Sequence, residues 1–159
     1  MKYNTQTDKS WANEIMTSKE GSEGWHDTIH DWGCLVTSLS NIIQITQEKG
    51  FTPKDLNDVI KQIKGYRYLK DNRAKVEEAS FLEFEVLLRY FTTYDIIRNV
   101  KEYKNDGFYI ARVNHLGYGH YINVLSKQGN IFWCFDVWDG FVKSYYVKDI
   151  EFFHKVVIK

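Results

Sequence analysis

The fold is decided by the segment DWGCLVTSLSNIIQIT, residues 31–46. Apolar side chains recur in it at steps of three and four residues, which predicts a helix that begins near Cys34 and packs one face against a core. Gly33 and Gly50 stand at its two ends, where glycine commonly begins or ends a helix. We therefore expect a central helix with a cysteine at its first position.

A thiol at the start of a helix has a chemical use. The unpaired backbone N–H groups and the positive end of the helix dipole stabilise a thiolate, which is the nucleophilic form of cysteine. An alternative interpretation is that Cys34 is a small buried side chain that only fills the core, the commoner role of a free cysteine. A disulfide to Cys134, the only other cysteine, is a further alternative.

Helical signals continue after residue 50. Thr52-Pro53 predicts an N-cap and a first helical residue, and the helix that follows ends near Gly65. Apolar spacing predicts a short helix over residues 81–90 and a further helix over residues 94–103. Two segments fit no pattern: residues 66–80 are charged and ambiguous, and residues 1–31 are polar and can be ordered only by lying on other parts of the chain.

After Gly107 the pattern changes to short apolar runs separated by glycine turns, which is typical of strands. The predicted strands are residues 108–113, 120–125, 130–136, 142–147 and 152–158. Helices followed by strands predict an α+β fold in which N-terminal helices pack on an antiparallel sheet. A length of 159 residues suits a single domain over residues 1–159.

Composition excludes several classes of protein. The chain has 21 Lys and Arg against 21 Asp and Glu, so we expect no nucleic-acid partner, because such proteins gain affinity from a basic excess. No apolar stretch approaches the roughly 20 residues of a membrane span. Residues 1–11 are polar and lack the apolar stretch of a signal peptide. We expect a soluble, cytoplasmic protein, with export by another route left open and the oligomeric state not predicted.

A candidate base follows in the motif Gly117-Tyr118-Gly119-His120, at the start of a predicted strand. The glycines let the backbone bend sharply and leave His120 open to a cleft. A neutral imidazole is the side chain best matched to accepting a proton near pH 7. Taken alone, His120 is better interpreted as an ordinary surface or core histidine.

Two further side chains could complete a catalytic site. A carboxylate after the strand 130–136 could bind the second imidazole nitrogen of His120, and Asp136 and Asp139 compete for this role. We prefer Asp136, since Asp139 begins an Asp-Gly turn. Gln6, in the polar N-terminal segment, has an amide that could complement the backbone N–H of Cys34 in an oxyanion hole.

In this order along the chain, these residues resemble the C39-like cysteine peptidases. The likeness covers nearly the whole sequence and rests on Gln6, Asp8, Trp11-Ala12, Gly33-Cys34, Thr37-Ser38-Leu39, Thr52-Pro53, Leu56, Gly119-His120, Asp136 and Trp138-Asp139-Gly140. It implies a papain-like cysteine peptidase fold without metal or organic cofactor. It also implies Cys34 as nucleophile, His120 as general base and acid, Asp136 as its partner and Gln6 as the oxyanion donor.

The resemblance predicts a thiol protease or amidase that cleaves an amide bond in a peptide or peptidoglycan-like substrate. The alternative is an inactive papain-like module that binds a peptide or a protein without cutting it. The sequence names neither the substrate nor the cleavage specificity.

Two other patterns deserve weighing. His26 and His30 are four residues apart and could share a metal ion on a helix, but the flanking glycines favour a solvated loop. Basic residues between 61 and 75, with Lys101 and Lys104, form a stripe that could bind nucleic acid. Neighbouring acidic residues dilute that stripe, so a solvated face is favoured.

Overall fold

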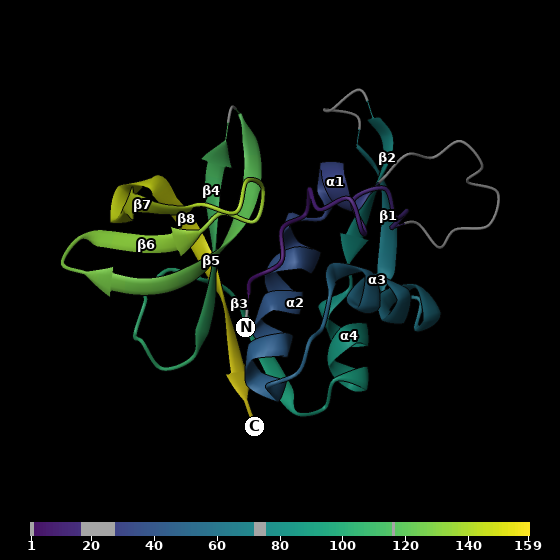
Figure 1. Cartoon of the computed structure of the whole chain (residues 1–159), viewed down its shortest axis with the longest axis horizontal. Helices are drawn as coiled ribbons and strands as arrows, with labels where there is room; N and C mark the ends of the chain where they lie inside the picture. The colour runs from purple at the N-terminus through teal and green to yellow at the C-terminus, as the bar shows by residue number, and fades with distance from the viewer. Residues whose placement is uncertain (1, 17–27, 72–75, 116) are drawn as a thin grey trace.

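Helix α2, Cys34–Gln47, lies between an antiparallel sheet and the other helices (Figure 1). The computed structural model describes residues 2–16, 28–71, 76–115 and 117–159. The remaining helices are α1 Ile29–Trp32, α3 Pro53–Gln62 and α4 Phe84–Tyr90, with a short 3₁₀ turn, η1 Val147–Asp149. None of these described helices is both long enough and apolar enough to cross a membrane.

The six-stranded sheet has the strand order β3-β8-β4-β5-β6-β7, and every neighbouring pair is antiparallel. Its strands are β3 Tyr94–Val100, β4 Phe108–His115, β5 Tyr118–Gln128, β6 Ile131–Phe135, β7 Val142–Tyr146 and β8 Ile150–Ile158. A separate hairpin, β1 Tyr66–Asp71 and β2 Val76–Leu82, occupies the segment that matched no pattern. The predicted α+β class with an antiparallel sheet is therefore confirmed.

Helix α2 confirms the predicted helix but is buried more deeply than one apolar face requires. Residues 36–44 are all buried, polar side chains included. The polar side is covered by the N-terminal segment, where the backbone N–H of Asn4 donates to Asn41 at 2.6 Å. Asn41 in turn donates to Asn123 of β5 at 3.0 Å. The described polar segment at the start of the chain, residues 2–16, is thus ordered by lying on other elements, with Asn4 on α2 and Ala12 on α1.

Helix α3 begins as predicted. The Thr52 side chain accepts from the backbone N–H of Asp55 at 3.1 Å, and the Asp55 carboxylate accepts from the backbone N–H of Thr52 at 2.8 Å. This reciprocal capping box satisfies two of the N–H groups that a helix start leaves open. Pro53 follows at the first helical position, where its missing N–H has no consequence.

The prediction of a helix over residues 94–103 is wrong, because residues 94–100 form strand β3. β3 pairs with β8, from Tyr94 opposite Ile158 to Ile97 opposite Lys155. The partner strand is the last in the chain, so local apolar spacing contains no signal of this pairing. The helix predicted over residues 81–90 begins only at Phe84, because Phe81 still belongs to strand β2.

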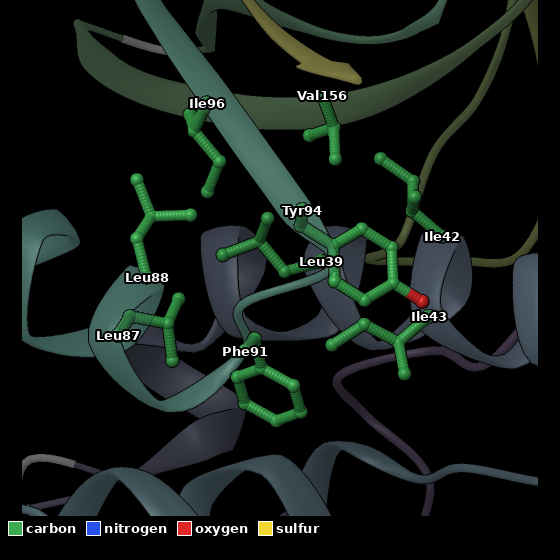
Figure 2. A pocket seen from close by; sticks show the side chains of 9 residues that line it. All are labelled: Leu39, Ile42, Ile43, Leu87, Leu88, Phe91, Tyr94, Ile96 and Val156. Atoms are coloured by element: carbon green, nitrogen blue, oxygen red, sulfur yellow. The ribbon is translucent and has the colours of Figure 1, made fainter. Parts of the chain in front are cut away.

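A small apolar pocket lies where α2 and α4 meet β3 and β8 (Figure 2). Its walls are Leu39, Ile42, Ile43, Leu87, Leu88, Phe91, Tyr94, Ile96 and Val156. The Tyr94 hydroxyl bonds to Thr46 at 2.5 Å, so the walls offer no free polar group. We interpret the pocket as a packing gap in the core. It contacts α2 from Leu39 onward and so lies away from the first turn of α2, which contains Cys34.

Candidate active site

Cys34 is held at the start of α2 by the residue before it. A side chain at Gly33 would lie 2.4 Å from the carbonyl oxygen of Ile29, so only glycine lets α1 run into α2 here. Both cysteines are free; Cys34 is partly exposed and Cys134 is buried. The disulfide alternative is therefore wrong. Cys34 is the first residue of α2, where the backbone N–H groups of a helix have no partner within the helix.

His120 stands near the start of β5 and contacts Asp136, just beyond the end of β6. The ring nitrogen Nε2 lies 2.7 Å from Asp136 Oδ1. An ionised carboxylate only accepts hydrogen bonds, so Nε2 carries the proton and donates it. The Cys34 side chain lies close enough to the imidazole to raise its pKa, and Nδ1 is the ring nitrogen that does not face Asp136. The chain thus brings Cys34, His120 and Asp136 into one connected group.

The pKa of His120 is set by opposing effects. Burial of the ring is the largest and lowers the pKa, while the hydrogen bonds to Asp136 and Cys34 and their negative charges raise it. The raising effects are greater in sum and bring the pKa from 6.5 to about 9. The environment of His120 therefore favours an imidazolium at neutral pH, between a carboxylate and a thiol.

Asp136 is surrounded by donors. Its Oδ1 accepts from the His120 ring at 2.7 Å and from the backbone N–H of Trp138 at 2.9 Å, and its Oδ2 accepts from Lys143 Nζ at 2.7 Å. Burial raises the pKa of this carboxyl, but the bonds from His120, Lys143 and Trp138 outweigh it and hold the pKa well below its usual range. Asp136 is thus a permanent anion beside His120.

Of the two competing carboxylates, Asp136 is the one in contact with His120. Asp139 binds Lys143 at 2.6 Å and accepts from the backbone N–H of Phe141 at 3.1 Å, which is a turn contact. Asp136 is 2% exposed and is the one that touches the imidazole of His120. Lys143 bridges the two carboxylates and fixes the turn that carries Asp136.

Gln6 is buried beside the approach to α2. Its backbone N–H donates to the Val137 carbonyl at 2.7 Å, which ties the N-terminal segment to the turn after Asp136. Its amide nitrogen lies 2.7 Å from the His30 carbonyl and 3.5 Å from that of Ile29. The shorter bond engages one amide N–H and the long contact engages the other only weakly. Both contacts of the amide nitrogen are therefore with carbonyls of α1.

Gly119, next to His120, is needed for a reason that the sequence did not suggest. Gly117 has a left-handed φ of +86°, in keeping with a sharp turn. Gly119 instead lies under the guanidinium of Arg112, since a Cβ there would be 2.1 Å from Nη2 and 2.5 Å from Cζ. Arg112 is also ion-paired with Glu151. A guanidinium is thus packed onto the backbone beside His120.

Gly119→Ala is expected to destabilise the protein modestly by pushing the Arg112 side chain away, since the obstructing atoms are the end of a flexible chain. In an Arg112→Ala background the same change should be neutral or stabilising, because alanine restricts the unfolded chain more than glycine does. A double-mutant cycle of urea unfolding measures this coupling. Equal effects of Gly119→Ala in both backgrounds would show that Arg112 does not set this requirement.

Sequence reasoning missed two members of the site, Lys143 and Arg112. Lys143 stands opposite Cys134 in the β6–β7 hairpin, and Arg112 stands opposite Tyr121 in the β4–β5 hairpin. Only a prediction of the strand pairing with its exact register could have placed these two residues beside the site. Trp138, in the turn after Asp136, also meets His30 edge-on, with ring centroids 4.9 Å apart.

The remaining site predictions have mixed outcomes. In the metal hypothesis, His26 lies outside the described residues, while His30 bonds Asp31 through Nδ1 at 2.7 Å. Within the described part of the chain, no three His, Cys, Asp or Glu side chains gather as a metal site. Arg73 and Lys75 of the basic stripe also lie outside it, and Arg67 is paired with Glu83 at 3.0 Å.

No protein-family model, no curated protein and no solved structure matches this chain. The likeness to C39-like peptidases therefore rests on the ordered residues quoted above. The chemistry that it implies is judged from the contacts of Cys34, His120 and Asp136.

Proposed function

We propose that this protein is a cysteine peptidase or amidase that cleaves an amide bond through a Cys34 thioacyl-enzyme. The observation that carries the proposal is the connected group of Cys34, His120 and Asp136. The imidazole has a carboxylate at 2.7 Å on Nε2, and the Cys34 side chain lies close enough to raise the pKa of the ring. A nucleophile next to a base that is itself oriented by a third group is the arrangement that covalent catalysis requires.

The side chains of Cys34 and His120, together with one water molecule, account for every bond and proton in the reaction. The proton given up by the Cys34 thiol is held on Nδ1 of the His120 imidazolium, and the thiolate sulfur of Cys34 forms a bond to the amide carbon. The resulting oxyanion collapses, the carbon–nitrogen bond breaks, and the imidazolium gives its proton to the leaving amine. Water, deprotonated by His120, then hydrolyses the thioester and restores the thiol.

The oxyanion formed in this reaction needs donors. The backbone N–H of Cys34, at the open start of α2, is one, and the amide of Gln6 is the proposed second. Support for Gln6 comes from its burial, its rigid attachment to the α1 carbonyls and the weak engagement of its second N–H, which has a single contact of 3.5 Å. Asp136 keeps Nε2–H of His120 in place throughout.

We further propose that the fold is papain-like and that the substrate is a peptide or peptidoglycan-like chain. The order of the elements supports this assignment, since a buried central helix headed by Cys34 packs on an antiparallel sheet that carries His120. Exposed aromatic side chains stand two residues from two members of the group, Trp32 before Cys34 and Trp138 after Asp136. Such rings suit an extended, partly apolar substrate.

Alkylation by iodoacetamide tests this proposal and separates it from a binding-only module. At pH 6 an ordinary thiol is roughly 0.3% thiolate, whereas a thiol that has passed its proton to His120 reacts as a thiolate. We expect Cys34 to be alkylated at least about tenfold faster than glutathione at pH 6, with Cys134 unmodified because it is buried. The His120→Ala variant should lose the excess rate. An equally slow Cys34 in both proteins would favour the inactive binding module.

A further inference from the structure

Three cations lie over neighbouring aromatic rings, and one of them, Arg112, adjoins the candidate site. The guanidinium of Arg112 lies 5.5 Å from the centre of the Phe152 ring, and Lys101 Nζ lies 5.9 Å from the same ring. The guanidinium of Arg98 lies 5.2 Å from the centre of the Phe84 ring. Arg98, Lys101 and Arg112 are called the cationic cluster below. Its rings limit how far the cations move and shield one side of them from water.

The cationic cluster reaches the reacting group through Arg112. Its guanidinium packs on Gly119, the residue before His120. Arg112 also stands opposite Tyr121, the residue after His120, in the β4–β5 pairing. Burial is the largest effect on the pKa of Tyr121 and raises it, the charge of Arg112 lowers it, and the charge of Cys34 raises it. The cluster and the thiol therefore adjoin the same short stretch of β5.

The positive charge of this cluster is only partly neutralised. Among the described side chains, Glu151 is the one carboxylate paired with it, and it binds Arg112. Lys101 donates instead to the backbone carbonyl of Glu151 at 2.9 Å. The neighbouring imidazole of His154 adds no charge, because burial, followed by Arg98 and Arg112, lowers its pKa to about 4. In a chain of zero net formal charge, this local excess beside the site is distinctive.

We propose that the cationic cluster binds a carboxylate of the substrate, so that the cleaved amide lies next to an acidic residue or a free carboxyl group. This inference rests on the proposed function and adds the substrate class to it. A guanidinium suits the task because its planar donors match a carboxylate in two bonds. The Arg112 side chain is 32% exposed and Arg98 and Lys101 are exposed, so a substrate can reach them.

A pair of thiol reagents that differ mainly in charge tests this inference at Cys34. Iodoacetate carries a carboxylate and iodoacetamide does not, and the ratio of their rates reports the local preference for an anion. In Arg112→Gln we expect the iodoacetate rate to fall about fivefold, the effect of roughly one unit charge at short range in water, with the iodoacetamide rate within about twofold. Arg112→Lys should keep most of the ratio, and 0.5 M salt should reduce it in the wild type.

Lys127→Gln is the matched control. Lys127 is an exposed cation that also lies over an aromatic ring, 5.5 Å from the centre of Phe132, but it is outside the cationic cluster. Its loss should leave the ratio unchanged. A ratio that stays at the wild-type value in both Arg112→Gln and Arg98→Gln would overturn the inference. The ratio can be measured for a slow thiol too, so low absolute rates with both reagents count against the proposed function and not against the cluster.

Discussion

Replacing Cys34 by alanine is expected to abolish amide hydrolysis while the protein stays folded. In this mechanism no other group can form the thioacyl bond, and removal of one member of such a group typically removes about 10⁴-fold or more of the rate. The fold should persist because Cys34 is the partly exposed first residue of α2, and alanine is the best helix former.

The substitution has a second consequence that needs no substrate. Without the thiol, His120 loses one of the two side chains, Asp136 and Cys34, that raise its pKa to about 9. We therefore expect the imidazole of Cys34→Ala to titrate at a lower pH than in the wild type, followed by NMR of the ring protons. Hydrolysis is measured by mass spectrometry on a mixed peptide library.

Cys134→Ala is the matched control for the loss of a thiol. The Cys134 side chain is buried in the core on β6, and burial raises its pKa to about 12, so it is neither accessible nor ionised. This variant should be less stable, since it leaves a small cavity, but should keep its hydrolysis and its His120 titration. Residual hydrolysis by Cys34→Ala at the wild-type rate would place the nucleophile elsewhere.

Elements whose pattern is local were predictable from the sequence. Helix α2 shows in its apolar spacing, α3 in the capping residues Thr52 and Pro53, and the hairpins of the sheet in their glycine turns. Strand β3 was not predictable in this way, because its partner β8 lies more than fifty residues further along the chain. Ile96 and Ile97 suit a strand by their branching, but Tyr94–Val100 also presents helical spacing.

The residues of the candidate site also differ in how far the sequence alone could predict them. Cys34 and His120 stand out because glycines precede them and because their residue types carry chemistry. The choice of Asp136 over Asp139 needed the actual turn, in which one carboxylate points to the imidazole and the other to Lys143. Lys143 and Arg112 depend on strand register, which a single sequence does not specify, so the charge surrounding the site could not be foreseen.

Replacing Asp136 by asparagine is expected to lower both activity and stability. The amide nitrogen would face Lys143 Nζ, so that two donors oppose each other where a carboxylate now accepts at 2.7 Å. His120 would lose the anion that stabilises its imidazolium. Hydrolysis should fall about 10⁴-fold, and the free energy of unfolding by about 3 kcal/mol, the typical effect of breaking a buried charge pair.

The stability difference should depend on pH in a defined way. The pKa of Asp136 is lowered from 3.8, so its contribution is present above pH 3.8 and is lost as the pH falls further. The pKa of His120 is raised from 6.5 to about 9, so its contribution is present below pH 6.5 and is lost as the pH rises toward 9. Urea unfolding should therefore show the largest difference between wild type and Asp136→Asn between pH 3.8 and pH 6.5.

Asp139→Asn separates the loss of a carboxylate near Lys143 from the loss of the one that binds His120. Asp139 contacts the same lysine but not the imidazole, and its side chain is 32% exposed. Its loss should change the free energy of unfolding by less than about 1 kcal/mol. The His120 titration and the rate of hydrolysis should stay close to those of the wild type. If the two variants proved equally active and equally stable across this pH range, Asp136 would be only a turn residue, and the ordering of the imidazole would have to come from Cys34 and the surrounding strand.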